Sequence, residues 1–172
     1  MAARPVPRSR RRVRPAGAAL AVLLALCAPA LAQVEENALK AAFVYNIISF
    51  ASWDGPLRRE VLVVCTAVDP GLSAALATLD GRQVAERRLS FRAARDMPAG
   101  CDVLVRAAAS PAVSAQPGRL VVCDGCVLPD AVTSVALGRD GARLRFDVDA
   151  AVASDAGVTF SSRLLRLARR VL

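Results

Sequence analysis

Histidine is absent from this 172-residue chain. Without it the chain cannot build Ser-His-Asp or Cys-His nucleophilic sites, and it has no imidazole ligand for a metal ion. Aromatic residues are also scarce, at 4% of the sequence, with one tryptophan and one tyrosine. Neither a Gly-x-Gly-x-x-Gly loop nor a Walker loop occurs. These absences exclude histidine-dependent hydrolases and nucleotide binding through either glycine-rich loop.

The N-terminus has the pattern of a cleavable export signal. Six arginines within the first 14 residues precede an uncharged run rich in alanine and leucine over residues 16–26. This run is shorter than the roughly 20 apolar residues that span a bilayer. Leu26 is too bulky before Cys27 for a lipobox, whereas Ala30, Leu31 and Ala32 predict cleavage after Ala32. We therefore expect a signal peptide over residues 1–32 and a mature domain over residues 33–172 that works outside the cytoplasm.

Removal of the signal changes the charge of the chain. Six of the 23 basic residues lie in the signal, while all 15 acidic residues follow it, so the mature chain has 17 basic residues and a formal net charge of +2. The formal charge of +8 for the whole chain mostly describes the leader. Because no basic patch interleaved with aromatic residues remains, nucleic-acid binding is not expected.

Four cysteines remain in the mature chain: Cys65, Cys101, Cys123 and Cys126. An even set in an exported chain predicts disulfides. If Cys123 pairs with Cys126, then Cys65 must pair with Cys101. The Cys-x-x-Cys motif is the only one with enzymatic potential, but Asp124 and Gly125 favour a tight turn and no convincing helix follows. A structural or regulatory disulfide is therefore favoured over a catalytic dithiol, and the 36-position gap between the other two cysteines disfavours a Cys₄ zinc site.

Helical and strand patterns alternate along the mature chain. Helices are expected over residues 36–53, 70–79 and 150–155, and from a cap at Ser161 or Ser162 to the C-terminus. Strands are expected over residues 61–65, 84–91, 103–105, 120–123, 133–137 and 142–148, the last two joined by a hairpin turn. This alternation predicts an α/β fold, a single-domain sandwich with a mixed, largely buried sheet flanked by helices.

Beyond the cysteines, four residues are candidates for a partner or ligand surface: Asn46, Trp53, Arg163 and Arg166. Asn46 falls on the main apolar face of the first expected helix, where a satisfied core amide is favoured over a ligand contact. The two arginines fall on the exposed side of the last expected helix. A solvated face there is favoured over a docking site for acidic partners or lipid headgroups.

Asp147 and Asp149 lie two positions apart on an expected strand, so their side chains point to one face. Paired carboxylates can serve acid–base catalysis. At the end of a strand, however, capping and turn chemistry are favoured. We therefore expect no catalytic residue, cofactor or metal.

Two segments together carry a family resemblance: LKAAFVYNIISFASW at residues 39–53, and FDVDAAVASDAGVTFSSRLLRLAR at residues 146–169. With the Leu-Val-Val-Cys strand and the Asp-Gly-Arg-Gln-Val segment between them, they resemble the YfiR family of small periplasmic proteins. The chain departs from the family pattern at Asp54, where Pro usually follows Trp, and at Asp149, where Asn is usual.

The resemblance implies a non-catalytic repressor that binds the periplasmic sensor domain of an inner-membrane diguanylate cyclase. Cyclic di-GMP signalling and biofilm formation would be the output. An outer-membrane lipoprotein would act as a competing partner. A second copy of the chain, forming a homodimer, is a further partner that the resemblance allows. Two alternatives come from other classes: a periplasmic thiol-disulfide oxidoreductase that uses Cys123 and Cys126, and a carrier of small apolar ligands with a pocket near Phe43, Phe50 and Trp53.

Overall fold

The computed structural model describes residues 16–54, 60–94 and 100–172. The chain divides into two compact units, Met1–Gln33 and Val34–Leu172. The expected signal peptide lies mostly outside the described residues, since residues 1–15 are not described and residues 16–31 are described only as helical backbone. Cleavage after Ala32 therefore stays a prediction. Within the described residues, no helix combines the length and apolarity needed to cross a membrane.

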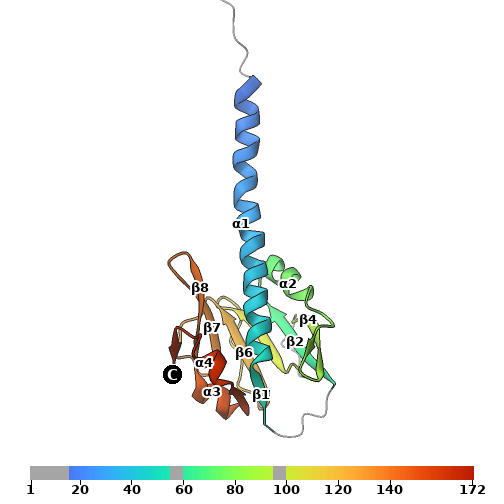
Figure 1. The fold of residues 1–172 in the computed structure, drawn as a ribbon, viewed down its shortest axis with the longest axis vertical. Coiled ribbons are helices and arrows are strands. Elements are labelled where there is room, and N and C mark those ends of the chain that lie inside the picture. Colours follow the sequence, from blue (N-terminus) through green and yellow to red (C-terminus); the bar gives the residue numbers. More distant parts are fainter. Residues whose placement is uncertain (1–15, 55–59, 95–99) are drawn as a thin grey trace, which may run out of the picture. The chain divides into compact units, whose positions relative to one another are not determined.

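An eight-stranded mixed sheet forms the centre of the second unit (Figure 1), in the order β10-β8-β7-β6-β5-β2-β4-β3. Strands β7, β6, β5, β2 and β4 run parallel, whereas β8 and β3 are antiparallel to β7 and β4, and β10 is parallel to β8. The strand bounds are β2 Val61–Ala67, β3 Gln83–Val84, β4 Arg87–Ala93, β5 Val103–Ala107, β6 Leu120–Asp124, β7 Val135–Asp140, β8 Arg143–Val148 and β10 Arg170–Val171.

In the described part of the chain, four helices accompany the sheet: α1 (Ala16–Ser49), α2 (Pro70–Ala77), α3 (Ala150–Asp155) and α4 (Ser162–Leu165). Side-chain oxygens cap three of them. Asp69 accepts hydrogen bonds from the first turn of α2, Asp149 accepts one from α3, and Ser161 accepts one from α4. The α/β sandwich with a mixed sheet flanked by helices is thus confirmed, and so is the cap at Ser161.

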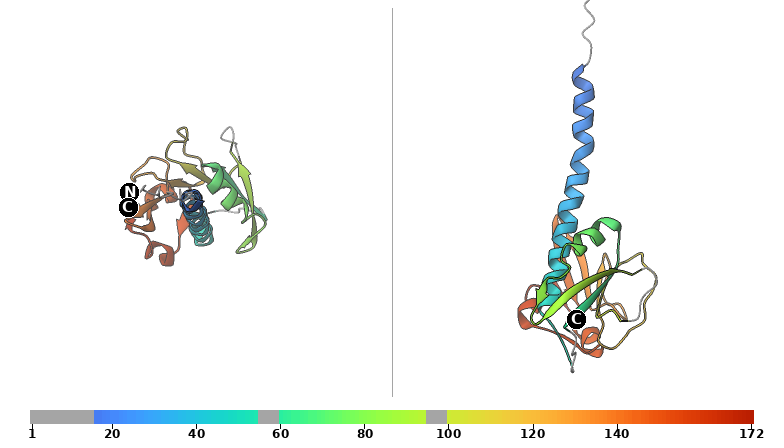
Figure 2. Two further views of the ribbon diagram at one scale, coloured as in Figure 1. Left: turned by 90° about the horizontal axis from the view of Figure 1, so that it is seen from above. Right: turned by 90° about the vertical axis from the view of Figure 1, so that its right-hand side faces the viewer.

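Among the described residues, all four helices contribute buried side chains to one core. Figure 2 shows the helices and the sheet from two further sides. Val64 and Val122 of the sheet belong to this core together with Ile47 of α1, Leu72 of α2 and Leu164 of α4. Because successive strand residues point to opposite faces, the neighbouring positions supply a second, smaller cluster. That cluster contains Cys65, Cys101, Leu104 and Val121.

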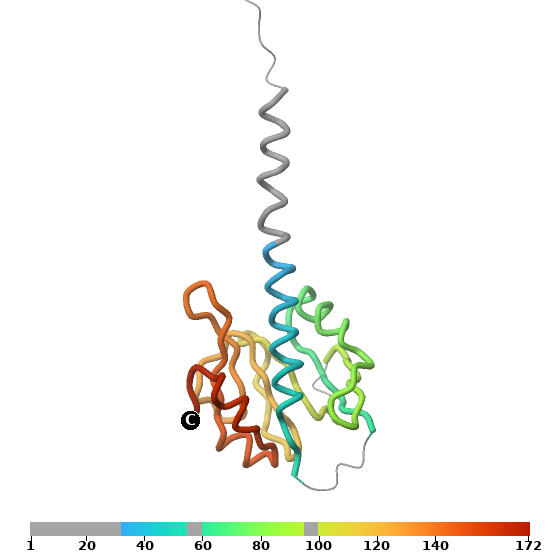
Figure 3. The backbone as a smooth tube through the Cα atoms, viewed as in Figure 1, coloured from blue at the N-terminus to red at the C-terminus, as the bar shows by residue number. Residues whose placement is uncertain are grey.

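Two segments that are far apart in the sequence of the second unit lie side by side, residues 51–53 and residues 158–160 (Figure 3). Strand β1 (Ala51–Trp53) follows α1 and pairs antiparallel with β9 (Val158–Phe160), so the last turn of α1 lies beside the C-terminal segment. The amide of Ser161 donates a hydrogen bond of 2.9 Å to the carbonyl of Phe50.

The first helix differs from its predicted end and face. It stops at Ser49, because residues 51–53 gain ladder partners in β9 instead of continuing the helix. Its buried side chains are Ala41, Val44, Ile47 and Ile48, whereas Leu39 of the predicted face is 48% exposed. Asn46 is consequently exposed, and the expected buried amide at this position is wrong; the buried amide of the helix is Asn37.

Two further elements were predicted incorrectly. The final helix ends at Leu165, and residues 170–171 form β10 because their backbone pairs with β8. The expected strand over residues 84–91 is broken at Ala85, whose φ of 52° turns the chain back, so β3 and β4 form a hairpin.

Candidate functional site

Both predicted cysteine pairs are bonded. Cys65 joins Cys101 with their Cα atoms 5.7 Å apart, which ties β2 to the segment before β5. Cys123 joins Cys126 with a Cα separation of 5.6 Å and closes the turn after β6. Cys123 is fully buried, and the described chain forms no helix between Cys126 and β7. Cys126 is half-buried, so the first cysteine of the motif is the inaccessible one, and the turn lacks the following helix N-terminus that activates a catalytic dithiol.

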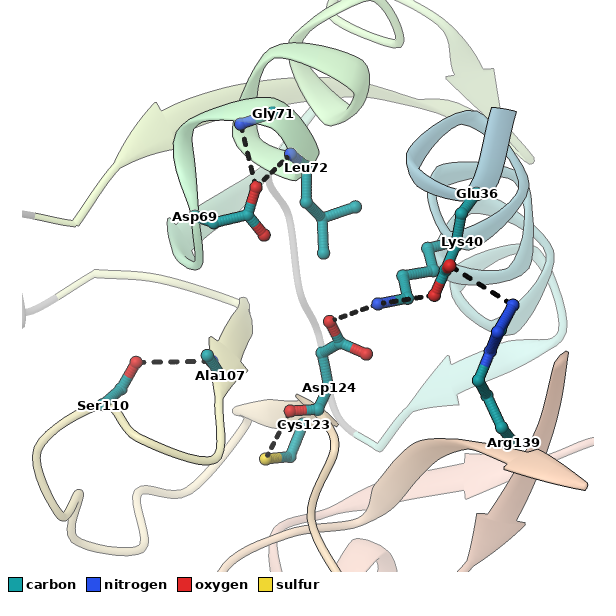
Figure 4. Close-up of polar contacts among 10 residues, drawn as sticks. All are labelled: Glu36, Lys40, Asp69, Gly71, Leu72, Ala107, Ser110, Cys123, Asp124 and Arg139. Atoms are coloured by element: carbon teal, nitrogen blue, oxygen red, sulfur yellow. Dashed lines mark hydrogen bonds and ion pairs between the residues drawn. The ribbon is translucent and has the colours of Figure 1, made fainter. Parts of the chain in front are cut away.

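A cluster of four charged side chains lies beside this turn (Figure 4). This edge cluster comprises Glu36 and Lys40 of α1, Asp124 of β6 and Arg139 of β7. The Lys40 ammonium is 2.8 Å from Asp124 Oδ2 and 3.3 Å from Glu36 Oε1, and Arg139 is 3.2 Å from Glu36 Oε2. Burial lowers the pKa of Lys40, but its contacts with Asp124 and Glu36 outweigh that effect and raise the pKa above its ordinary value.

The edge cluster is placed so that it joins α1 to the disulfide turn. Asp124 lies between the two bonded cysteines, and its carboxylate is only 17% exposed. The polar groups at the neighbouring strand ends are also paired: Ser110 Oγ donates to the Ala67 carbonyl at 2.6 Å and accepts from the Ala107 amide (Figure 4). These described groups are ion-paired or hydrogen-bonded with one another. They therefore connect neighbouring elements and do not form a free set of side chains for binding a ligand.

The described residues contain no group of three or more His, Cys, Asp or Glu side chains that could hold a metal ion. Asp147 lies in β8 and Asp149 lies just after it, and both are committed to structural contacts. Asp149 caps α3, and Asp147 binds two arginines. Neither carboxylate is arranged with the other as an acid–base pair.

An apolar cavity of about 290 Å³ lies where the two resemblance segments meet. We call it the end-segment cavity. Phe43 and Phe146, one from each segment, touch edge to face with their ring centroids 6.1 Å apart. The remaining lining residues are Asn46, Ile47, Phe50, Arg145, Leu164 and Leu167.

Trp53 lies apart from this cavity. Its indole N–H donates to the Gly118 carbonyl at 3.1 Å, and the Arg87 guanidinium is 5.5 Å from the ring centroid. It lines a separate cavity of about 170 Å³. Of the three aromatic residues named for the carrier hypothesis, Phe43 and Phe50 line the end-segment cavity, whereas Trp53 lines a different one.

Arg163 and Arg166 are exposed, as expected, although the helix at this position has four residues instead of extending to the C-terminus. Arg163 lies within α4 and Arg166 directly after it, on either side of Leu164, which lines the end-segment cavity. Of the four candidate surface residues, Asn46 thus lines this cavity, the two arginines lie in the segment that closes it, and Trp53 lies elsewhere.

Sequence reasoning missed the functions of Lys40, Asp124 and Arg139 in the edge cluster. Part of the signal was available, because Glu36 and Lys40 are four positions apart and such pairs meet on a helix surface. Asp124 and Arg139 reach Lys40 and Glu36 only because the sheet packs against α1. Local sequence patterns contain no information about this packing.

Two comparisons with known proteins complete these observations. The search of curated proteins gives no match for the chain. The family model described as YfiR/HmsC-like matches residues 37–169, a span that begins within α1 and ends at Arg169, one of the two arginines bound to Asp147. Because this span covers most of the chain and every strand of the sheet except β10, the chain belongs to the YfiR/HmsC-like family.

Proposed function

We propose that the mature domain is a non-catalytic periplasmic regulator, which binds the periplasmic sensor domain of an inner-membrane diguanylate cyclase and represses it. The observation that carries this proposal is the family match over residues 37–169. The family suggests a periplasmic regulator of a diguanylate cyclase, and the identity of the target and the direction of regulation are part of the proposal.

Two structural features support a regulatory protein in an oxidising compartment. Both cysteine pairs are closed, as is usual for exported domains of this size. The sulfur of Cys123 is buried, which argues against thiol exchange with a substrate protein. The oxidoreductase alternative therefore has little support from the geometry.

We assign the binding face to the side of the domain that carries the end-segment cavity. Asn46, Arg145 and Leu167 line it, and Arg163 and Arg166 are exposed in the segment that closes it. An apolar centre with a polar and cationic rim is typical of protein interfaces. Trp53 is a second, separate candidate contact.

Repression requires the domain to bind the inactive state of the cyclase more tightly than the active state. Release would come from a competing partner, an outer-membrane lipoprotein, or from reduction of Cys123–Cys126. Reduction would free Asp124 from its turn and weaken its hold on Lys40 of α1.

The test uses the exported chain, purified from the periplasm of an expressing bacterium, and the sensor domain of a cyclase encoded beside it. We expect saturable binding by calorimetry and a loss of cyclic di-GMP synthesis when the chain is added to membranes holding the full cyclase. An R163E/R166E variant should bind at least roughly tenfold more weakly, and R88E/R92E should bind as the unaltered chain does. Absence of binding to every co-encoded cyclase would overturn the proposal.

The reductive branch is tested separately. Binding is measured with and without a reductant that opens Cys123–Cys126, using the Cys123→Ser/Cys126→Ser variant as a control that is already open. We expect the reduced chain and this variant to show the same weakened binding. Equal affinity before and after reduction removes the redox branch and leaves competition as the means of release.

A further inference from the structure

The C-terminal segment of the mature domain carries an excess of positive charge. Residues 162–172 contain four arginines and no acidic side chain. The rest of the mature chain, residues 33–161, has 13 basic and 15 acidic residues and a formal charge of −2. Within the described residues, Arg163 and Arg166 have no ion-pair partner, and the single carboxylate of Asp147 is shared by Arg169 and Arg170.

Large apolar side chains are exposed in the same segment. Leu167 is 64% exposed, Val171 47% and Leu172 46%. We call these three residues, together with Arg163 and Arg166, the C-terminal surface. Elsewhere among the described residues, exposed large apolar side chains occur at scattered positions, with no comparable run of arginines beside them.

The backbone under the C-terminal surface is held in place, although chain ends commonly fray. The Arg169 amide donates to the Phe146 carbonyl at 2.8 Å, and the Leu172 amide donates to the Val148 carbonyl at 2.9 Å. Arg169 and Arg170 both bind the buried Asp147 through two nitrogens each. The exposed leucine and valine side chains therefore stand on an ordered support, and their exposure is not a result of fraying.

We propose that the C-terminal surface binds the anionic phospholipid face of a membrane, with its arginines at the phosphate level and Leu167 and the C-terminal apolar side chains entering the headgroup region. Basic residues near an anionic bilayer and apolar side chains that enter its interface add to one another. Arg163 and Arg166 have no acidic partner among the described residues, so they are available to a continuous negative surface.

This inference goes beyond the proposed function, which needs a sensor domain and no lipid. If both hold, the regulator and a cyclase anchored in the same membrane are confined to one surface. The local concentration of each around the other then rises without any added protein contact.

The experiment measures sedimentation of the exported, purified chain with vesicles of neutral phosphatidylcholine, and with vesicles that contain roughly 30% phosphatidylglycerol. We expect binding to the anionic vesicles only, and its loss at high salt because the interaction is screened. The R163E/R166E variant should bind at least roughly tenfold more weakly, and Leu167→Gln several-fold more weakly. The matched variant R88E/R92E has the same charge change on exposed residues of β4 and should bind as the unaltered chain does.

Three outcomes would overturn the inference: no binding to anionic vesicles, equal binding to neutral vesicles, or equal losses in R163E/R166E and R88E/R92E. If the unaltered chain binds the sensor domain but no vesicle, the surface serves a protein partner and the lipid proposal is wrong. If it binds vesicles but no sensor domain, the lipid proposal stands and the proposed function fails. The circular dichroism of each variant shows whether it is folded.

Discussion

Asp147 is almost fully buried and yet charged, because two arginines that follow it in the chain by more than 20 positions return to bind it. Arg169 reaches its two oxygens at 2.8 and 2.6 Å, and Arg170 reaches Oδ2 at 3.1 and 2.7 Å. The Arg169 hydrogen bond, helped by that from Arg170 and by both charges and opposed by burial, lowers the pKa of Asp147 to about 2. One side chain thus holds the last strand against β8.

Replacing this carboxylate should therefore destabilise the domain. In Asp147→Asn the amide cannot serve both arginines, and we expect the free energy of unfolding to fall by about 2 kcal/mol. Urea unfolding measures this change. The matched control is Asp155→Asn, an exposed aspartate at the end of α3. A change for Asp147→Asn no larger than for the control would show that the arginines contribute nothing there.

The same ion pair predicts a pH dependence of stability. Because the folded pKa of Asp147 is depressed from 3.8 to about 2, its contribution is full above pH 4 and is lost as the pH falls toward 2. The difference in unfolding free energy between the native chain and Asp147→Asn should therefore be constant from pH 5 to neutrality and should shrink below about pH 4. A constant difference down to pH 2 would contradict this assignment.

Among the elements, the two disulfides close loops of very different length. Cys65–Cys101 spans 36 positions and Cys123–Cys126 spans three. On the chain-entropy estimate the first contributes about 4 kcal/mol and the second about 2 kcal/mol to stability. We expect C65A/C101A to unfold at clearly lower urea concentration than C123A/C126A. The reverse order would mean that the short loop stabilises mainly through Asp124 and its contacts with α1.

The edge cluster connects α1 to this short loop, and its contribution is separable. Lys40→Met and Asp124→Asn should each cost about 1–2 kcal/mol, since both side chains are mostly buried and each leaves the other without its main partner. Amide hydrogen exchange should become faster in the first turns of the mature part of α1. Glu35→Gln, which changes an exposed neighbour, serves as the control.

A double-mutant cycle on Lys40 and Asp124 then isolates their interaction. Strict additivity of the two losses would show that the contact does not connect the helix to the disulfide turn.

The sequence predicted most of the sheet but not its borders. Buried parallel strands such as β2 and β5 are nearly continuous runs of apolar residues, which local patterns recognise well. Strands β1, β9 and β10 were missed because they are two or three residues long and exist only through pairing with distant partners. The leucine-rich end, residues 164–172, has helical spacing, and tertiary pairing with β8 overrides it.

The candidate site was predictable to a similar extent. Cysteine pairing followed from counting and from the tight Asp124–Gly125 turn, and the structure confirms it. Asn46 was placed on the wrong side of its helix because α1 is apolar round much of its surface, so its buried face depends on where the sheet lies. Cavities that join residues more than 100 positions apart leave no local signal.

At the scale of the whole molecule, charge and apolar surface are distributed unequally. The C-terminal segment carries the positive excess, and the end-segment cavity lies between it and α1. Arg163, Arg166 and Leu167 belong to both the proposed protein-binding face and the proposed membrane-binding surface, so the two partners share residues. Binding of one partner should alter access for the other, which a combined assay with vesicles and sensor domain would detect.

The pairing of residues 51–53 with residues 158–160 has a consequence for how the chain is synthesised and folds. Residues 43–53 complete their packing only when residues 146–164 arrive, so the main core cannot close while the ribosome still holds the C-terminal part. A chain that folds late stays unfolded long enough to pass through a translocation channel. If the chain is exported as we propose, the long sequence separation between these paired segments keeps it unfolded during translocation. Folding is then completed after release on the far side of the membrane.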